Sequence, residues 1–155
     1  MTVAELWREA YQGEVLGEAI FGFLAERETD AGRAAMLTAL TELERSTKAL
    51  AEPVFERNGY DRGDDAATIA AALANPDALA AMGWEDFLRS ITPIAEGFLV
   101  QYRQLVDLVD NADDRAIAEA YVEHELALVA FARRALGEEP GEPLEPIRAL
   151  AHELI

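Results

Sequence analysis

The sequence predicts an all-α protein, an antiparallel four-helix bundle with a long crossover between its second and third helices and a short C-terminal helix. Apolar residues recur at helical spacing along four long segments, and capping residues or glycines mark the ends of these segments. A weakly patterned stretch over residues 60–83 separates the second segment from the third, and it is long enough to return the chain to the far end of a bundle. With 155 residues, the chain suits one domain over residues 1–155.

The first two helices form a predicted hairpin. Thr2 and Glu5 have the spacing of a capping box, which predicts a helix over residues 2–28. A second helix is predicted from residue 31 to residue 50, and the short connection makes the two helices antiparallel neighbours. Pro53 lacks a backbone donor and is expected to kink or end the second helix.

The helical pattern of apolar residues weakens after the second helix and becomes regular again in the later helices. Asn58–Gly59 offers a left-handed stop for any continuation of the second helix. The crossover is expected to hold a short helix over residues 66–74, which Asn75–Pro76 breaks. Ile94 is predicted to face the core. Two further long helices are predicted over residues 84–110, with a bend at Thr92–Pro93, and over residues 111–137. A last short helix is predicted to begin at Pro146. Its apolar face, which points toward the bundle and does not include His152, consists of Ile147, Leu150, Ala151 and Leu154.

Several polar residues fall on the predicted inward faces. His124 shares a face of its helix with Tyr121, Leu128 and Phe131, so it is expected in the core. Glu14 lies inside the apolar stripe of the first helix, and it is flanked by Gly13 and Gly17. Each glycine costs about 1 kcal/mol in a helix interior, so we expect close approach or open volume there. The predicted polar core cluster consists of Glu14, Glu44, Thr47, Tyr121 and His124.

Composition excludes several classes of function. The formal net charge of −17 opposes nucleic-acid and anionic membrane partners, because both carry phosphate groups. The chain has no cysteine, which excludes disulfides and thiolate metal sites. The N-terminal segment has no signal-peptide pattern, and no apolar run is long enough to span a membrane. A cytoplasmic protein is therefore expected.

The spacing of the inward residues resembles that of the ferritin-like superfamily, which includes rubrerythrins and related di-iron oxidases. Glu14 lies on the first helix, Glu44 precedes Thr47 by three residues on the second, and Tyr121 precedes His124 by three on the fourth. The family holds two metal ions with a Glu, an ExxH pair, a second Glu and a second ExxH pair. The resemblance implies iron or manganese ligands at Glu14, Glu44 and His124, and oxidoreductase-like activity.

The departures from the family pattern imply a degenerate or variant metal site. Thr47 stands where the second-helix histidine is expected, and Tyr121 stands where the fourth-helix glutamate is expected. A hydroxyl and a phenol are poor substitutes for imidazole and carboxylate as metal ligands. Glu96 is the nearest carboxylate on the third long helix, but it lies roughly 140° from the centre of the apolar stripe. Glu18 lies near the edge of its own stripe.

Three interpretations of the polar cluster remain open. It is a purely structural hydrogen-bond network with no cofactor, or Glu14, Glu44 and His124 bind one metal ion or an asymmetric pair. Alternatively, a metal-free pocket binds a small molecule, or performs acid–base chemistry on one, through Glu44, Tyr121 and His124. Tyr121 and Thr47 are the candidate cofactor-binding residues in addition to the metal ligands.

A homodimer is a further expectation of the sequence. Apolar residues outside the central stripe of the fourth long helix need cover, which a second copy, the crossover or the last helix would supply. These residues are Val122, Leu126, Val129 and Leu136.

Overall fold

The computed structural model describes the backbone of residues 1–154 and the side chains of residues 1–150, and this part of the chain is helical without strands. The all-α prediction is therefore confirmed. The side chains of Ala151, His152 and Leu154 lie outside the described residues. In chain order the helices are α1 (Val3–Arg27), α2 (Ala31–Asn58), α3 (Asp65–Ala72), α4 (Pro76–Ala81), α5 (Trp84–Leu108), α6 (Ala112–Ala135) and α7 (Glu145–Leu154).

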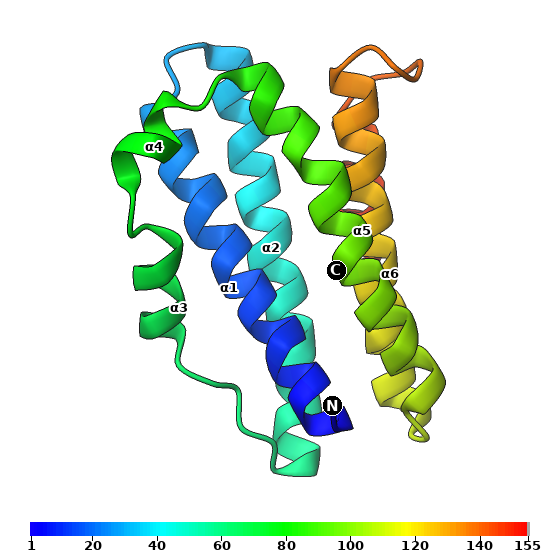
Figure 1. The fold of residues 1–155 in the computed structure, drawn as a ribbon. Helices are drawn as coiled ribbons and strands as arrows, with labels where there is room; N and C mark the ends of the chain where they lie inside the picture. Colours follow the sequence, from blue (N-terminus) through cyan, green and yellow to red (C-terminus); the bar gives the residue numbers. More distant parts are fainter. Residues whose placement is uncertain (155) are drawn as a thin grey trace.

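Four long helices form two hairpins that lie side by side (Figure 1). Helices α1 and α2 pack closely along their lengths, and so do α5 and α6. The crossover carries α3 and α4 along the outside of α1, so that α5 begins at the end of the bundle opposite to the end of α2 (Figure 1). Helix α7 folds back onto α6 and α2. No helix in the described residues combines the length and apolar character needed to cross a lipid bilayer.

Most predicted helix ends are observed. Thr2 and Glu5 form both hydrogen bonds of the capping box, and Gly59 ends α2 with a left-handed φ of 65°. The second helix, predicted over residues 31–50, does not end at Pro53 but continues to Asn58, where the predicted glycine stop follows. Proline leaves the carbonyl of Ala49 without its helical partner, but both residues are exposed, so water can reach that carbonyl. The crossover also contains α4, which the sequence did not predict and which begins at Pro76.

One apolar residue of α5 is misplaced by the prediction. Ile94, which was predicted to face the core, is 57% exposed. Leu88 and Leu99, which were not among the predicted core residues, are buried. The observed buried face of α5 follows a stripe at helical spacing through Leu88, Ile91, Ala95, Leu99, Tyr102 and Leu105, and Ile94 falls at its edge.

The chain itself covers most of the apolar residues expected at a dimer interface. Val129 is buried, and Val122 and Leu136 pack against the two core clusters. Leu126 is 39% exposed. The homodimer thus remains a prediction with a smaller apolar surface than the sequence indicated.

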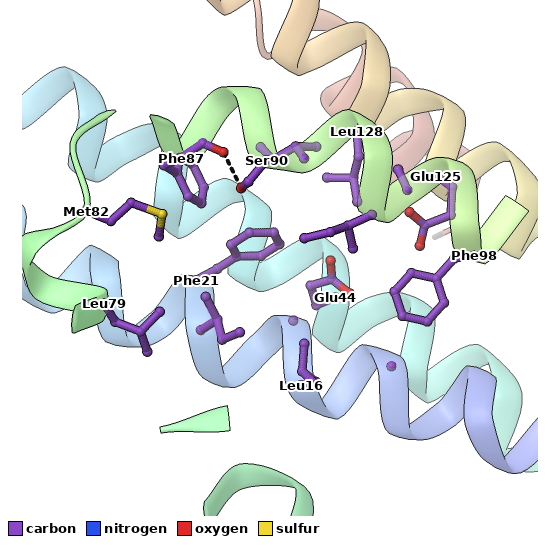
Figure 2. Close-up of a pocket in the computed structure, with 16 residues that line it drawn as sticks. Leu16, Phe21, Glu44, Leu79, Met82, Phe87, Ser90, Phe98, Glu125 and Leu128 are labelled. Atoms are coloured by element: carbon purple, nitrogen blue, oxygen red, sulfur yellow. Dashed lines mark hydrogen bonds between the residues drawn. The ribbon is translucent and has the colours of Figure 1, made fainter. Parts of the chain in front are cut away.

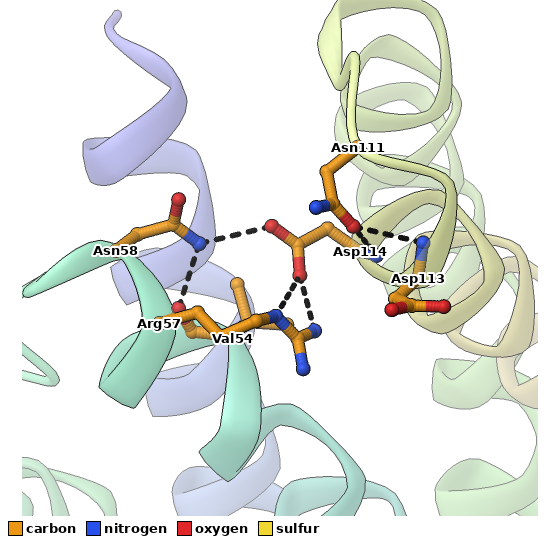
Figure 3. A network of polar contacts seen from close by, with 6 residues as sticks. All are labelled: Val54, Arg57, Asn58, Asn111, Asp113 and Asp114. Atoms are coloured by element: carbon orange, nitrogen blue, oxygen red, sulfur yellow. Dashed lines mark hydrogen bonds and ion pairs between the residues drawn. The ribbon is translucent and has the colours of Figure 1, made fainter.

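A network of polar contacts joins the end of α2 to the start of α6 (Figure 3). Asp114 is buried and accepts hydrogen bonds from Asn58 Nδ2 at 2.9 Å and from the Arg57 guanidinium, whose Nε lies at 3.2 Å. Ten residues back from Arg57 lies Thr47, and ten residues on from Asp114 lies His124. The two helices are antiparallel and have the same rise per residue. The contacts of Asp114 with Arg57 and Asn58 therefore place Thr47 and His124 at the same height along the bundle.

Candidate metal centre

Three helices bring four ionisable side chains together in the core. Glu14 comes from α1, Glu44 from α2, and His124 and Glu125 from α6, and each is 4% exposed or less. His124 Nε2 lies 3.5 Å from Glu14 Oε2, 3.3 Å from Glu44 Oε1 and 3.9 Å from Glu125 Oε1. We call these four residues the carboxylate–histidine cluster. It contains all three predicted metal ligands and one residue that the sequence interpretation omitted.

Thr47 fixes the imidazole of His124. Its Oγ1 lies 2.7 Å from His124 Nδ1, on the side of the ring away from the carboxyl groups, and both residues are fully buried. An Nδ1–H that donates to Thr47 leaves the Nε2 lone pair facing the cluster, which is the form of histidine that binds a metal ion. Thr47 therefore occupies the position of a residue that orients a ligand.

Tyr121 is a buried phenol beside the cluster. The hydroxyl has no hydrogen-bond partner among the described residues, and the ring packs edge-on against Trp7 and Tyr102 at centroid distances of 6.0 and 5.2 Å. Burial raises the pKa of Tyr121 well above its usual range, and the charges of Glu14 and Glu44 raise it further. The phenol consequently keeps its proton and is available as a donor.

The cluster holds three carboxyl groups and one imidazole. Burial and the neighbouring Glu44 charge raise the pKa of Glu14 well above its usual range, and burial raises the pKa of Glu125 to about 8. Burial, the largest influence, lowers the pKa of His124, but the neighbouring carboxylates Glu44 and Glu125 outweigh it, so that this pKa is raised overall. Burial is thus the main reason that Glu14 and Glu125 favour the protonated, uncharged form, and the nearby carboxyl groups add to it.

The other candidate acids lie outside the cluster. Glu18 accepts hydrogen bonds from Lys48 Nζ at 2.7 Å and from Arg45 Nε at 2.9 Å, so it is paired at the edge of the α1–α2 hairpin. Lys48 is thereby engaged, and its charge offsets only a small part of the rise in the pKa of Glu14. Glu96 is exposed on α5. The third long helix consequently contributes no carboxylate to the cluster.

Glu14, His124 and Glu125 form a group that could hold a divalent cation. Atoms bound to one first-row metal ion at about 2.0–2.2 Å lie about 3.0–4.4 Å from one another, and the three distances from His124 Nε2 fall in this range. Atoms of Glu14, His124 and Glu125 also lie within 4.8 Å of one another. Glu14 Oε2 is buried without a hydrogen bond. A cation would satisfy this oxygen and balance the charge.

An apolar pocket of about 310 Å³ adjoins the cluster between α1 and α5 (Figure 2). Its walls are aliphatic and aromatic, and Leu79 and Met82 from the crossover close one side. Ser90 also lines it, but that hydroxyl already donates to the Phe87 carbonyl at 2.6 Å. We call this space the α1–α5 pocket. Its lining residues are Gly13, Leu16, Gly17, Ile20, Phe21, Glu44, Leu79, Met82, Phe87, Ser90, Ile91, Ile94, Ala95, Phe98, Glu125 and Leu128.

The glycines around Glu14 make room for the site, as the sequence predicts. A Cβ at Gly17 would lie 2.6 Å from Glu44 Cδ, whereas a Cβ at Gly22 would meet only Thr41 Cγ2 at an ordinary 3.6 Å. We expect Gly17→Ala to lower the free energy of unfolding by about 1–3 kcal/mol, because it displaces a buried carboxyl group. The matched change Gly22→Ala is expected to raise it by up to about 1 kcal/mol. Urea denaturation measures both, and equal effects would contradict the close approach.

Glu125 is the residue that the sequence interpretation missed. The helical spacing of the sequence could have indicated it, since Glu125 follows Tyr121 by four residues and precedes Leu128 by three. All three residues are buried on one face of α6. The interpretation assigned the fourth-helix carboxylate position to residue 121 and therefore did not test residue 125.

Comparisons with protein-family models, with curated proteins and with solved structures found no match for this chain.

Proposed function

We propose that this protein is a ferritin-like helical bundle with a variant metal centre, in which Glu14, Glu44, His124 and Glu125 bind iron or manganese. The observation that carries the proposal is the buried excess of carboxyl groups, with one imidazole for three acids and an unpaired Glu14 Oε2. Buried charges require a partner, and a divalent ion is the partner that this donor set suits. The two hairpins and the long crossover support the ferritin-like layout.

A bound iron or manganese ion would supply redox chemistry at the inner end of the α1–α5 pocket. The residues of the chain prepare the surroundings for it. Thr47 holds His124 in the metal-binding orientation, and the apolar pocket walls exclude water and accommodate an organic molecule. Tyr121 offers a proton beside Glu14. This arrangement supports an oxidoreductase-like function for the bundle.

Metal analysis tests the proposal directly. Purified protein, loaded anaerobically with ferrous or manganous ions and then desalted, is expected to retain about one or two ions per chain. His124→Ala should lose them, because it removes the only nitrogen ligand and the atom that all three carboxyl groups face. The control is substitution of the other histidine in the chain, His152→Ala. Retention of the ions by His124→Ala would overturn the proposed centre.

The position of the α1–α5 pocket favours a second candidate function, acid–base chemistry on a small molecule without a metal. Glu44 and Glu125 line the pocket, and a carboxyl group with a pKa of about 8 can exchange protons near neutral pH. Tyr121 and His124 do not line the pocket, so Glu125 takes the place that the sequence assigned to them in this alternative. Protein that binds no metal but still binds a ligand in the pocket would favour this function.

A further inference from the structure

The α1–α5 pocket is apolar along its walls and acidic at its inner end. In Figure 2 the carboxyl group of Glu44 lies between Phe21 and Phe98, and that of Glu125 lies beside Phe98. No lysine, arginine or histidine is among the described residues that line it. The pocket thus lacks any group that would balance an anionic ligand.

Glu125 is the acid of this pocket whose carboxyl group forms no hydrogen bond among the described residues. It is 4% exposed, and no side chain described in the structure forms a hydrogen bond to its carboxyl group, which lies 3.9 Å from His124 Nε2. Glu44, in contrast, contacts the same imidazole nitrogen at 3.3 Å. A ligand in the pocket that carries N–H donors would supply hydrogen bonds to the Glu125 carboxyl group.

The charge of the surroundings decides which ligand matches. A carboxylate or phosphate ligand would face Glu44 and Glu125 in a poorly solvated space with no basic side chain in the lining, which is unfavourable. A neutral apolar ligand would leave Glu125 unpaired. An ammonium group supplies both positive charge and N–H donors. This preference concerns the metal-free chain, in which no ion engages Glu44 and Glu125 and both line the pocket.

We propose that the α1–α5 pocket binds a primary amine with an apolar body, whose ammonium group lies between Glu44 and Glu125. The pocket volume of about 310 Å³ is roughly twice that of a cavity that holds benzene. One aromatic ring with a short alkyl arm therefore fits. Leu16 and Ile94 line the pocket and are exposed, so they mark its opening between α1 and α5.

The test compares three ligands that share one body. The full-length chain, kept in EDTA, is titrated with 3-phenylpropylamine, 3-phenylpropanol and 3-phenylpropanoate, and binding is followed by NMR of isotope-labelled protein. The amine is expected to bind at least tenfold tighter than the alcohol, and the carboxylate to bind more weakly than both. Chemical shift changes should centre on Gly13, Gly17 and Ala95, because these residues line the pocket.

Two variants and one small ligand complete the experiment. Glu125→Gln should reduce the preference for amine over alcohol to less than threefold, while unchanged dispersion of the NMR spectrum shows that the variant is folded. Glu123→Gln makes the same change at an exposed position of α6 and should keep the preference. Methylamine tests attraction of any cation to a chain of formal charge −17 and should not compete.

Defined outcomes would overturn the inference. The inference is wrong if the alcohol binds as tightly as the amine, or if the preference for amine over alcohol survives Glu125→Gln. It is also wrong if none of the three ligands binds. Because the titration is run in EDTA, a chain that fails to bind metal can still bind the amine, and a chain that binds metal can still fail this test. The two proposals therefore fail independently.

Discussion

Glu14→Gln is expected to stabilise the metal-free protein and to abolish its binding of divalent cations. Glutamine keeps the shape of the side chain but carries no charge. Glu14 is fully buried beside Glu44, so in the folded chain it must either hold a charge without water or take up a proton. Both cost free energy. We expect the free energy of unfolding to rise by about 1–3 kcal/mol at pH 7.5 in EDTA, within the range seen when buried ionic groups are neutralised.

The same substitution removes an oxygen ligand, so Mn²⁺ affinity should fall by about a hundredfold or more, because loss of a hydrogen bond to a metal ligand already costs about 10–100-fold. Urea denaturation in EDTA and a Mn²⁺ titration measure the two effects. Glu9→Gln makes the matched change on the exposed face of α1 and should alter neither. If the cluster is only a structural network, Glu14→Gln would instead destabilise the chain. That result would contradict the metal centre.

The metal-free protein is expected to lose stability as the pH rises from 5.5 to 7.5. The pKa of Glu125 is about 8 in the folded chain, against an ordinary value of 4.5, so the folded state binds more protons than the unfolded state between these values. Stability due to that proton is present at low pH and is lost as the pH rises through the folded pKa. The raised pKa of His124 acts in the same direction.

For Glu125 alone, two pH units correspond to about 3 kcal/mol, or roughly 6–12 °C in Tm. Exposed carboxyl groups are already ionised at pH 5.5, so the buried groups dominate this range. Glu125→Gln is the control and should flatten the dependence. Mn²⁺ takes the place of protons in the cluster, so it should raise Tm more at pH 7.5 than at pH 5.5. Thermal unfolding in EDTA and in Mn²⁺ measures both effects, and equal stabilisation by Mn²⁺ at the two pH values would contradict cation binding here.

The sequence predicted the long helices well because their signals are local. Apolar spacing and the Thr2–Glu5 capping box act within a few residues, and the structure confirms both. The continuation of α2 past Pro53 depends on water reaching one exposed carbonyl, which spacing does not report. Ile94 was misplaced since the exact phase of α5 depends on how it packs against α6.

The candidate site was predicted in part for the same reason. Helical phase placed Glu14, Glu44 and His124 inward, and the structure brings these three side chains together. The family pattern directed attention to Tyr121 and away from Glu125, which is equally buried on the same face. Neither the pocket nor the role of Thr47 at Nδ1 could be derived, because each depends on the relative placement of helices that are distant in sequence.

The carboxylate–histidine cluster is divided equally between the two halves of the molecule. Glu14 and Glu44 belong to the α1–α2 hairpin, and His124 and Glu125 belong to the second hairpin. A cation that binds all four side chains is therefore a non-covalent cross-link between two units that each form from neighbouring segments of the chain. Separation of the hairpins would have to break these bonds, whereas formation of each hairpin would not require them. Occupancy of the site would thus control the lifetime of the assembled bundle more than the rate at which it assembles.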